Sequence, residues 1–453
     1  MKKIKIVFCR RMHTILVAGA GKSSIYLIHY LLSHAPRHKW KVIVADGDAN
    51  SIAEKINGHS FAEAAVIDIT NEAERRPLVQ RADIVVSLMP PHLHIHLAKD
   101  CLQLKKNLIT SSYISPEMKE MDAAVKAAGL MFMCEMGLDP GIDHMTANQI
   151  IHSVQRVAAS LTSFKSYCGG LVAPESDDNP WHYKFSWNPK NIITAGLGGA
   201  KYLQNGKHVD VPYEKIFENN KKIKVEDLGS LAYYPNRDSL RYLDLYDVPD
   251  IKTFIRATLR YPNFCKGWQA IINLGLTNEA DKFDTSGQTY SSWLKNKTEY
   301  NNGVSLSEHV ARKLEVNADD KVISMLEWLG LFNDDVLQQG NLSSAEVLLQ
   351  TLLKKWEMAP VEKDMVVMQH EVEYIHRGKK INLTSSMVIK GENREYSAMA
   401  KTVGLPMGVL ARMVLTKKLT PPTGVLIPNM PSVYRPLLTE LSHHGINFKE
   451  TVE

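Results

Sequence analysis

The ten residues from Glu135 to His144 bring together side chains that could move protons. Glu135, Asp139, Asp143 and His144 are titratable, and two glycines and a proline shape the backbone between them. An apolar run at residues 130–134 precedes them, which is the pattern of a buried strand that ends in a polar loop. Carboxylates and imidazoles at such a strand end can serve as general acids or bases. The sequence therefore predicts a reactive site at this loop.

A glycine-rich loop, Gly19-Ala20-Gly21, lies between an apolar strand and an amphipathic helix. Gly19 permits a tight turn, Gly21 lets the backbone approach a pyrophosphate, and the helix N-terminus offers N–H groups. The third position of the motif is Ser24 rather than glycine, so helix and strand should pack less closely. G-x-G alone also describes an ordinary strand–helix turn, but its context favours a dinucleotide. The expected phosphate-binding residues are Gly19, Gly21, Lys22, Ser23 and Ser24.

The second strand ends at Asp46, where dinucleotide-binding folds place an acid. A carboxylate there accepts hydrogen bonds from the ribose 2′-hydroxyl and repels a 2′-phosphate, which favours NAD over NADP. Asp48 competes for this role, or it starts the next helix. Further cofactor contacts are expected at later strand ends: Asp68 and Ile69 near adenine, and Ser87 and Leu88 near nicotinamide.

Strand and helix patterns alternate through residues 14–150. The predicted strands are 14–18, 41–45, 64–69, 83–89, 107–111 and 130–135, with helices between them. Continuous apolar strands separated by helices indicate a parallel sheet covered on both faces, a Rossmann-type α/β fold. Because ligands collect at the carboxyl ends of such strands, loops 87–94, 110–115 and 135–144 should lie together.

The remaining chain is less regular. Residues 160–290 are rich in Tyr, Trp, Asn, Pro and Gly, whereas residues 304–357 have a helical pattern that includes the capping box Ser343-Ser344-Ala345-Glu346. Residues 365–374 and 380–390 should be paired strands, and apolar helices are expected at 408–415 and 434–443. A chain of 453 residues suggests two or three domains.

Composition excludes several classes of protein. The net charge of +5 is spread along the chain, which speaks against nucleic acid, and no apolar stretch approaches the roughly 18 residues needed to span a membrane. Five scattered cysteines indicate a reducing cytosol, so we expect a cytoplasmic protein.

The alternating histidines His92, His94 and His96 could suggest a metal site if they lay on a strand. A helical pattern follows Pro90-Pro91, so we expect no metal. Met12 is an alternative start, which makes residues 1–11 an extension.

Several longer motifs resemble the glutamate-forming saccharopine dehydrogenase (saccharopine reductase) family. The matching segments occur in family order over nearly the whole chain: 109–116, 137–144, 166–171, 174–176, 179–180, 183–187, 232–239 and 258–261. The resemblance implies a Rossmann-type domain at 12–142 and 396–453. It also implies a mixed α/β substrate-binding and dimerisation domain at 143–300 and 358–395, and a small helical domain at 301–357.

The resemblance implies oxidation of saccharopine by NAD(P) and water to glutamate and 2-aminoadipate 6-semialdehyde, or the reverse, by a homodimer. The implied substrate contacts are Ser112, Tyr113, Ser186, Arg237, Thr258, Leu259 and Arg260, and the implied catalytic candidates are Asp139, Tyr113 and Cys168. Each has a structural alternative. Arg237 could pair with Asp238, Asp139 could cap the helix that starts near Ile142, and Cys168 could simply pack.

Two departures from the family matter. Fungal members that use NADP tend to carry an arginine after the second strand, whereas this chain has Asp46-Gly47, which again favours NAD. Degradative members are usually fused to a lysine–ketoglutarate reductase half, for which this chain is too short. Two other functions stay open: a carboxynorspermidine-type reductive condensing dehydrogenase, and a non-catalytic NAD-binding protein.

Overall fold

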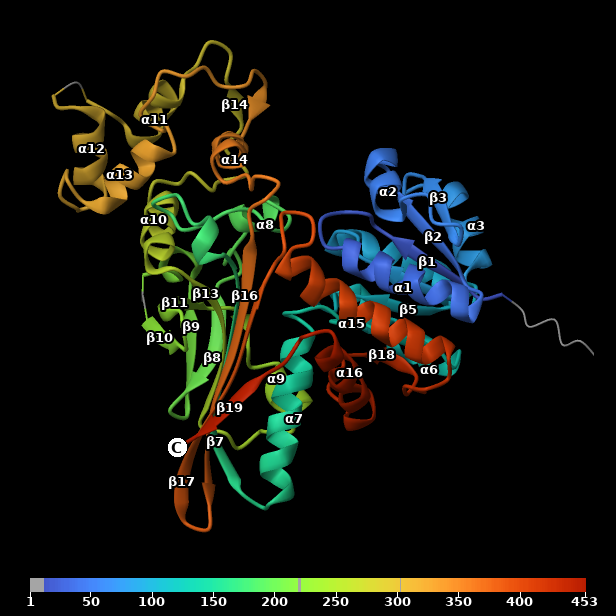
Figure 1. Cartoon of the computed structure of the whole chain (residues 1–453). Helices are drawn as coiled ribbons and strands as arrows, with labels where there is room; N and C mark the ends of the chain where they lie inside the picture. Colours follow the sequence, from blue (N-terminus) through green and yellow to red (C-terminus); the bar gives the residue numbers. More distant parts are fainter. Residues whose placement is uncertain (1–11, 219–220, 302) are drawn as a thin grey trace, which may run out of the picture. The chain divides into compact units, whose positions relative to one another are not determined.

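The computed structural model describes residues 12–218, 221–301 and 303–453 (Figure 1). The expectation about residues 1–11 lies outside these residues. The chain forms two compact units. The first comprises Met1–Gln149 and Ala400–Asn447, and the second comprises Ile150–Met399 and Phe448–Glu453. Each is described by itself below.

The first unit is built on a seven-stranded parallel sheet with the order β18-β6-β5-β4-β1-β2-β3. Its strands are β1 (Thr14–Ala18), β2 (Lys41–Asp46), β3 (Ala62–Val66), β4 (Ile84–Ser87), β5 (Asn107–Thr110), β6 (Met131–Met133) and β18 (Gly424–Leu426). The predicted Rossmann-type sheet is thus confirmed. The strand order reverses between β1 and β4, which is where ligands bind in such sheets. The C-terminal segment adds the seventh strand, which periodicity had not indicated.

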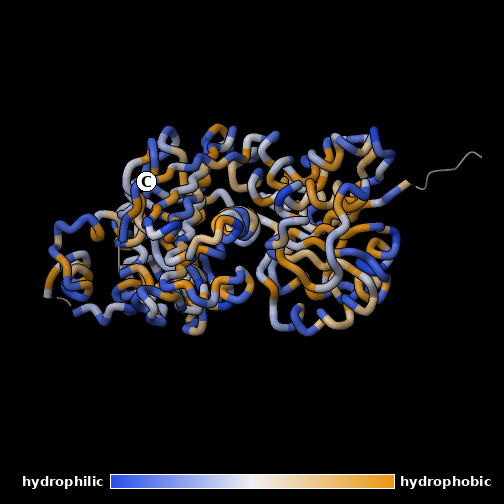
Figure 2. Tube along the Cα trace, turned by 90° about the horizontal axis from the view of Figure 1, so that it is seen from below, coloured by the Kyte–Doolittle hydropathy of each residue, from blue (hydrophilic) through white to orange (hydrophobic). Residues whose placement is uncertain are grey.

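Helices cover this sheet, and hydrophobic residues run through the interior of the unit (Figures 1 and 2). They are α1 (Ile25–His38), α2 (Ala49–Ile56), α3 (Glu72–Arg81), α4 (His94–Gln103), α5 (Pro116–Glu120), α6 (Asp122–Ala127), α15 (Ala398–Leu415) and α16 (Pro431–His443). A further helix, α7 (Ile142–Arg156), begins in the first unit and continues into the second. A short 3₁₀ turn, η1 (Pro91–Leu93), precedes α4. It supports the expectation of helical rather than extended geometry after the two prolines.

Helix α15 packs closely on α1. A Cβ atom added at Gly404 would lie 3.0 Å from the backbone nitrogen of Leu27, so only glycine allows this approach. Farther along, Arg412 forms a partly buried ion pair with Glu440 of α16 (2.7 Å), and the Tyr30 hydroxyl of α1 hydrogen-bonds to both. By length and hydropathy α15 could cross a membrane, contrary to our expectation that no stretch could, but 72% of it is buried inside the protein. It is a core helix by packing.

The second unit contains a mixed ten-stranded sheet with the main path β10-β11-β13-β7-β16-β17-β19. Its strands are β7 (Ser160–Val172), β8 (Ala200–Gln204), β9 (Lys207–Val211), β10 (Lys221–Val225), β11 (Gly229–Pro235), β12 (Arg237–Asp238), β13 (Thr253–Arg260), β16 (Asp364–His376), β17 (Lys379–Lys390) and β19 (Lys449–Val452). β7 runs parallel to β13 and antiparallel to β16. The expected mixed α/β architecture, including the pair β16–β17, is confirmed.

The helices of this unit are mostly short. They are α8 (Lys190–Ile193), α9 (Tyr242–Leu245), α10 (Pro262–Asn273), α11 (Tyr290–Thr298), α12 (Leu306–Lys313), α13 (Lys321–Trp328) and α14 (Ser344–Lys355). The unit also contains the 3₁₀ turns η2 (Pro174–Ser176) and η3 (Tyr213–Lys215). A separate two-stranded sheet pairs β14 (Phe283–Asp284) with β15 (Asn341–Leu342). The predicted capping box starts α14, because Ser343 and Glu346 each accept the other's backbone N–H.

One hydrophobic core joins residues 181–276 to residues 290–356. The helical segment therefore shares its core with the neighbouring part of this unit, and the division into three domains stays a prediction. The tail differs from expectation in one respect. β19 pairs with β17, so the last residues belong to the second sheet and not to the Rossmann-type sheet.

Asp364, at the start of β16, holds the N-terminus of α15. Its two carboxylate oxygens accept the backbone N–H groups of Ala398 (2.6 Å) and Met399 (2.9 Å). Burial raises the pKa of this carboxyl to about 6, against the lowering effect of those N–H groups. Ionisation therefore costs more in the folded than in the unfolded protein.

The Asp364→Asn substitution tests this cap. Asparagine does not titrate and turns an amide N–H₂ toward the helix N-terminus, so the variant should melt below the wild type. Because the folded pKa is raised, the wild type should lose up to roughly 3 kcal/mol of this advantage as the pH rises from about 4 to 6. Melting temperatures of both proteins between pH 4 and 8 check this. A gap that widens with pH would contradict it.

Candidate active site

The glycine loop of the first unit fits a bound dinucleotide. Gly19 has a φ of +105°, and a Cβ there would lie 3.0 Å from the carbonyl carbon of Leu88. The loop therefore needs glycine to pass the end of β4. By contrast, a Cβ at Gly21 would have no atom within 4 Å, which leaves open space at the backbone that should face a pyrophosphate. Ser24 is buried and bonds the Gly21 carbonyl through its hydroxyl (2.8 Å), which closes the turn before α1.

Asp46 ends β2, as predicted, but both of its oxygens are used within the protein. Oδ2 accepts the Ala20 N–H (2.7 Å) and Oδ1 accepts the Asp48 N–H (3.0 Å). The carboxylate thus holds the glycine loop against the strand end. Asp48 caps α2 through Asn50 N–H, in line with the helix-start alternative.

The other predicted cofactor residues also lie at strand ends. Asp68 accepts hydrogen bonds from the N–H and hydroxyl of Thr70 (2.8 and 2.7 Å), while Ile69 is buried. Leu88 donates its N–H to the Ala18 carbonyl (2.8 Å), which keeps the backbone of this loop beside the glycine turn. Their contacts with a cofactor stay a prediction.

His94, at the start of α4, links two of the predicted loops. Its Nδ1 lies 2.8 Å from the hydroxyl of Ser87, and its Nε2 lies 2.8 Å from the hydroxyl of Ser112. Burial lowers the pKa of the ring to about 4, so His94 is neutral near pH 7. A neutral ring donates through one nitrogen and accepts through the other, which fixes both hydroxyls. From sequence, His94 was considered as a possible metal ligand, and this bridging position was not predicted.

The loops after β5 and β6 are joined by main-chain bonds. The N–H of Glu135 donates to the Ser112 carbonyl (3.1 Å), and that of Met136 donates to the Thr110 carbonyl (3.0 Å). These bonds bring two predicted catalytic residues together, because the Tyr113 hydroxyl donates to Oδ1 of Asp139 (2.9 Å). The expected convergence of loops 110–115 and 135–144 is therefore observed.

The 135–144 loop folds back on itself. Gly137 N–H donates to the Pro140 carbonyl (2.9 Å), and a Cβ at Gly141 would lie 2.0 Å from the Gly137 oxygen, so no side chain fits there. The Asp139–Pro140 peptide bond is cis. Glu135 has a φ of +54°, a left-handed conformation that costs a non-glycine residue about 1 kcal/mol. Surrounding contacts must therefore hold Glu135 in place.

In the second unit, Arg260 is a buried cation in an aromatic cage. It is 3% exposed, and its guanidinium carbon lies 5.4–5.9 Å from the ring centres of Tyr183, Tyr234 and Phe264. Nη1 donates to the Leu259 carbonyl (2.8 Å), whereas the buried Nε has no hydrogen-bond partner. No carboxylate pairs with Arg260 among the residues described. A cation in this setting is suited to binding an external carboxylate.

Other predicted residues of this unit lie near Arg260 along the sheet. Thr258 of β13 pairs in register with Cys168 of β7. Leu259, the residue between Thr258 and Arg260 in the chain, is buried. Ser186 is buried, and its hydroxyl bonds to Asp364, which helps to lower the pKa of that carboxyl. Cys168, although buried, belongs to this unit, whereas Tyr113 and Asp139 belong to the first.

Arg237 has different surroundings. It is exposed on the short strand β12, opposite Ala200, and has a φ of +52°. Its neighbour Asp238 accepts the Leu240 N–H (2.9 Å). The two predicted substrate arginines therefore lie in unlike settings, and their shared role stays a prediction.

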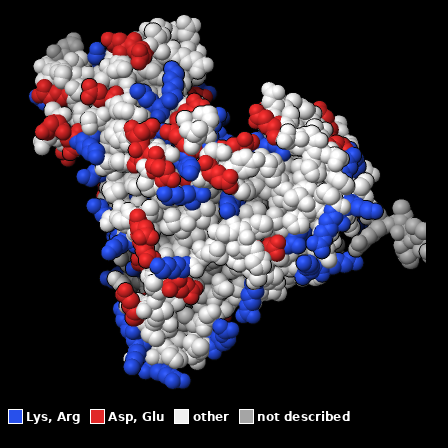
Figure 3. All heavy atoms as spheres, in the orientation of Figure 1, with Lys and Arg blue, Asp and Glu red and all other residues white. Residues whose placement is uncertain are grey.

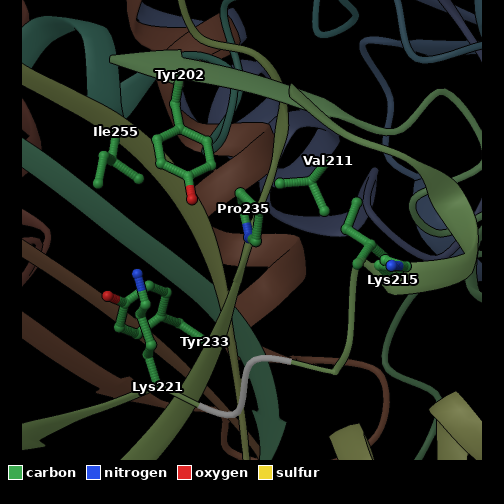
Figure 4. A pocket seen from close by; sticks show the side chains of 8 residues that line it. Tyr202, Val211, Lys215, Lys221, Tyr233, Pro235 and Ile255 are labelled. Atoms are coloured by element: carbon green, nitrogen blue, oxygen red, sulfur yellow. The ribbon is translucent and has the colours of Figure 1, made fainter. Parts of the chain in front are cut away.

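Two surface features fall outside the predicted site. On the face shown in Figure 3, acidic and basic side chains are interspersed rather than gathered by sign. A pocket in the second unit, with the Tyr202 hydroxyl directed into it (Figure 4), contains none of the predicted site residues. It is lined by Tyr202, Val211, Lys215, Ile216, Lys221, Tyr233, Pro235 and Ile255. Among the described residues no cluster of three His, Cys, Asp or Glu side chains is suited to a metal ion.

Replacing Arg260 by methionine should stabilise the unliganded protein. The substitution keeps most of the side-chain volume and removes a buried charge that has no carboxylate partner, so we expect a gain of about 1–3 kcal/mol. Thermal melting measures it. Lys184→Met is the matched control, because Lys184 is buried but paired with Asp178 (2.8 Å) and Glu362, and it should lower the melting temperature. If both substitutions lower the melting temperature, the view that Arg260 is a buried charge without compensation is wrong.

Comparisons with known proteins identify relatives along the whole chain. Residues 15–133 match the saccharopine dehydrogenase NADP binding domain, and residues 137–446 match the saccharopine dehydrogenase C-terminal domain. The saccharopine dehydrogenase [NADP(+), L-glutamate-forming] of Schizosaccharomyces pombe is 32% identical over 97% of this chain and 99% of its own length. Apo saccharopine dehydrogenase (L-Glu forming) from Saccharomyces cerevisiae superposes with a TM-score of 0.87 at 31% identity, over 97% of this chain and 100% of that one.

A longer animal relative is also similar. The mitochondrial alpha-aminoadipic semialdehyde synthase of Mus musculus is 33% identical over 99% of this chain. The chain spans about half the length of this relative and of its cattle and rat counterparts (47–48%).

The names of the fungal relatives and of the first matching domain favour NADP, so the predicted preference for NAD is not supported. The structure offers a reason. The carboxylate of Asp46 is engaged by Ala20 and Asp48 in shaping the loop, so its presence alone does not decide the cofactor. Binding of a nicotinamide dinucleotide as such agrees with the comparisons. By domain content, near full-length similarity and fold, this chain belongs to the saccharopine dehydrogenase family.

Proposed function

We propose that this chain is an L-glutamate-forming saccharopine dehydrogenase of lysine metabolism. In that reaction saccharopine, oxidised dinucleotide and water give glutamate, 2-aminoadipate 6-semialdehyde, reduced dinucleotide and a proton. The reverse reaction is a reductive condensation. The proposal rests on the similarity to the fungal enzyme of that name, which extends over 97% of this chain and 99% of the relative.

The loop pair of the first unit is suited to the proton transfers. Oxidation removes a hydride from the lysine-derived carbon beside the secondary amine and leaves an imine. A bound nicotinamide dinucleotide supplies the hydride acceptor. A base must take the amine proton, activate water on the imine and return a proton to the departing glutamate. We assign this work to Asp139, directly or through a water, with the Tyr113 phenol holding the carboxylate through its 2.9 Å hydrogen bond.

Arg260 is suited to one of the three substrate carboxylates. Its buried Nε lacks a partner, and the Tyr183, Tyr234 and Phe264 rings keep the guanidinium away from water. A carboxylate that pairs with it would satisfy a donor that the unliganded protein leaves unsatisfied. Ser112, Ser186, Thr258 and Arg237 are proposed as further contacts with the substrate.

Assembly and compartment are also proposals. We propose a homodimer, which light scattering of the purified chain would test. The predicted cytoplasmic location has no support from the animal relatives, whose names give a mitochondrial location.

Asp139→Ala should lower kcat for saccharopine oxidation by roughly 100-fold, because a positioned base contributes at least that much. Tyr113→Phe should have a smaller effect, and the double variant should be little worse than Asp139→Ala, since the two side chains act together. Initial rates across pH 6–10 measure both. Unaltered turnover and an unaltered pH profile in Asp139→Ala would show that this residue only shapes the turn.

Asp46→Ser tests the choice of cofactor. The Asp46 carboxylate holds the Ala20 and Asp48 N–H groups, so serine should loosen the glycine loop and lower kcat/KM for NAD and for NADP alike, with their ratio changed by less than about twofold. The matched control is Asp48→Ser, because serine also caps helices and should leave both kcat/KM values unchanged. A rise of about tenfold or more in the ratio of kcat/KM for NADP to that for NAD in Asp46→Ser would show instead that the carboxylate selects the cofactor.

A further inference from the structure

We propose that Glu135 and His144 are a positioning pair that sets the geometry of Tyr113 and Asp139. This inference rests on the proposed function, in which those two residues carry the proton transfers. Neither Glu135 nor His144 is assigned contact with substrate or cofactor. Their role would be to hold the two reactive side chains at the separation that the chemistry needs.

The pair is fully buried inside the first unit. Oε2 of Glu135 lies 2.8 Å from Nε2 of His144, and both side chains are at most 2% exposed. The other ring nitrogen of His144 lies 3.6 Å from Oδ2 of Asp143, which is equally buried. An imidazole between two carboxylates is an expensive cluster to bury, and packing alone would be served as well by apolar side chains. Fixed geometry is the advantage that a hydrogen-bonded cluster offers over an apolar one.

One end of the cluster reaches the backbone that carries Tyr113. Oε1 of Glu135, the oxygen not facing His144, accepts the N–H of Ile114 (3.1 Å). Because Ile114 follows Tyr113 directly, this bond fixes the main chain at the base of the phenol. Glu135 makes this contact from a left-handed backbone conformation, with a φ of +54°.

The other end reaches the backbone that carries Asp139. Oδ1 of Asp143 accepts the N–H of Gly141 (2.6 Å), two residues after Asp139. His144 also donates its own N–H to the Gly141 carbonyl (3.0 Å). A single buried cluster therefore fixes both backbones from which the 2.9 Å bond between Tyr113 and Asp139 is made.

Two variants of His144 separate positioning from simple packing. His144→Leu removes the nitrogen that faces Glu135, so the loops should shift and kcat for saccharopine oxidation should fall by roughly 10- to 100-fold, as small misplacements of reactive groups do. KM for the dinucleotide should not change, because the glycine loop is untouched. His144→Gln keeps an N–H donor and should recover much of the lost kcat.

Hydrogen exchange of the unliganded protein tests the same inference without any substrate. The amides of residues 112–115, 139, 141 and 142 should exchange faster in His144→Leu and in Glu135→Gln than in the wild type. The matched control is Asp122→Asn, since Asp122 accepts a backbone N–H from Val425 (2.9 Å) in the same unit. It should speed exchange near Val425 and leave kcat unchanged.

Faster exchange of these amides together with a lower kcat and rescue by His144→Gln supports the proposal. Exchange at the wild-type rate, or a kcat within twofold of the wild type in both disruptive variants, overturns it. If His144→Leu does not fold, Glu135→Gln, which keeps the size of the side chain, gives the same readouts. A wild-type protein that does not oxidise saccharopine defeats the proposed function, while the exchange rates still decide whether the pair holds the loops.

Discussion

The hydrogen bond between Tyr113 and Asp139 depends on two strand-end loops being held at a fixed separation. Neither loop has regular structure, so their order comes from contacts across the gap: two main-chain bonds from Glu135 and Met136, the Glu135 carboxylate on Ile114, and the turn closed by Gly137 and Gly141. His94 adds a third attachment by bridging Ser87 to Ser112. The Tyr113–Asp139 pair is thus the partly buried end of a polar network, and such a network can keep the geometry of a site without a ligand.

The two units contribute different chemistry. The first supplies the glycine loop and the Tyr113–Asp139 pair, which suit a dinucleotide and a proton transfer. The second supplies Arg260, a cation that the surrounding rings bury but do not neutralise. A buried cation without a carboxylate partner is the kind of group that a bound anion would stabilise, in line with the proposed role of Arg260. Asp364 is another buried ionisable group, and burial raises the pKa of this carboxyl, which caps α15.

Much of this could be predicted from sequence because local patterns carried it. Apolar strands followed by Gly19, Asp46 or Asp139 indicated the parallel sheet and the loops at its carboxyl edge, and the box at Ser343–Glu346 indicated α14. What escaped prediction depends on distant partners. Strand β18, the pairing of β19 with β17, and the cap that Asp364 gives to α15 join segments tens to hundreds of residues apart. The NAD preference failed for a related reason, since the type of residue at Asp46 did not reveal that backbone N–H groups already occupy its oxygens.

The central claim is that the Tyr113–Asp139 loops and Arg260 serve the oxidation of saccharopine. The most direct measurement is the initial rate of dinucleotide reduction by the purified chain with saccharopine, using NAD and NADP in parallel and counting the glutamate released. The account predicts saccharopine-dependent reduction with one glutamate formed for each dinucleotide reduced. Tight binding of the dinucleotide without any saccharopine-dependent reduction would contradict it.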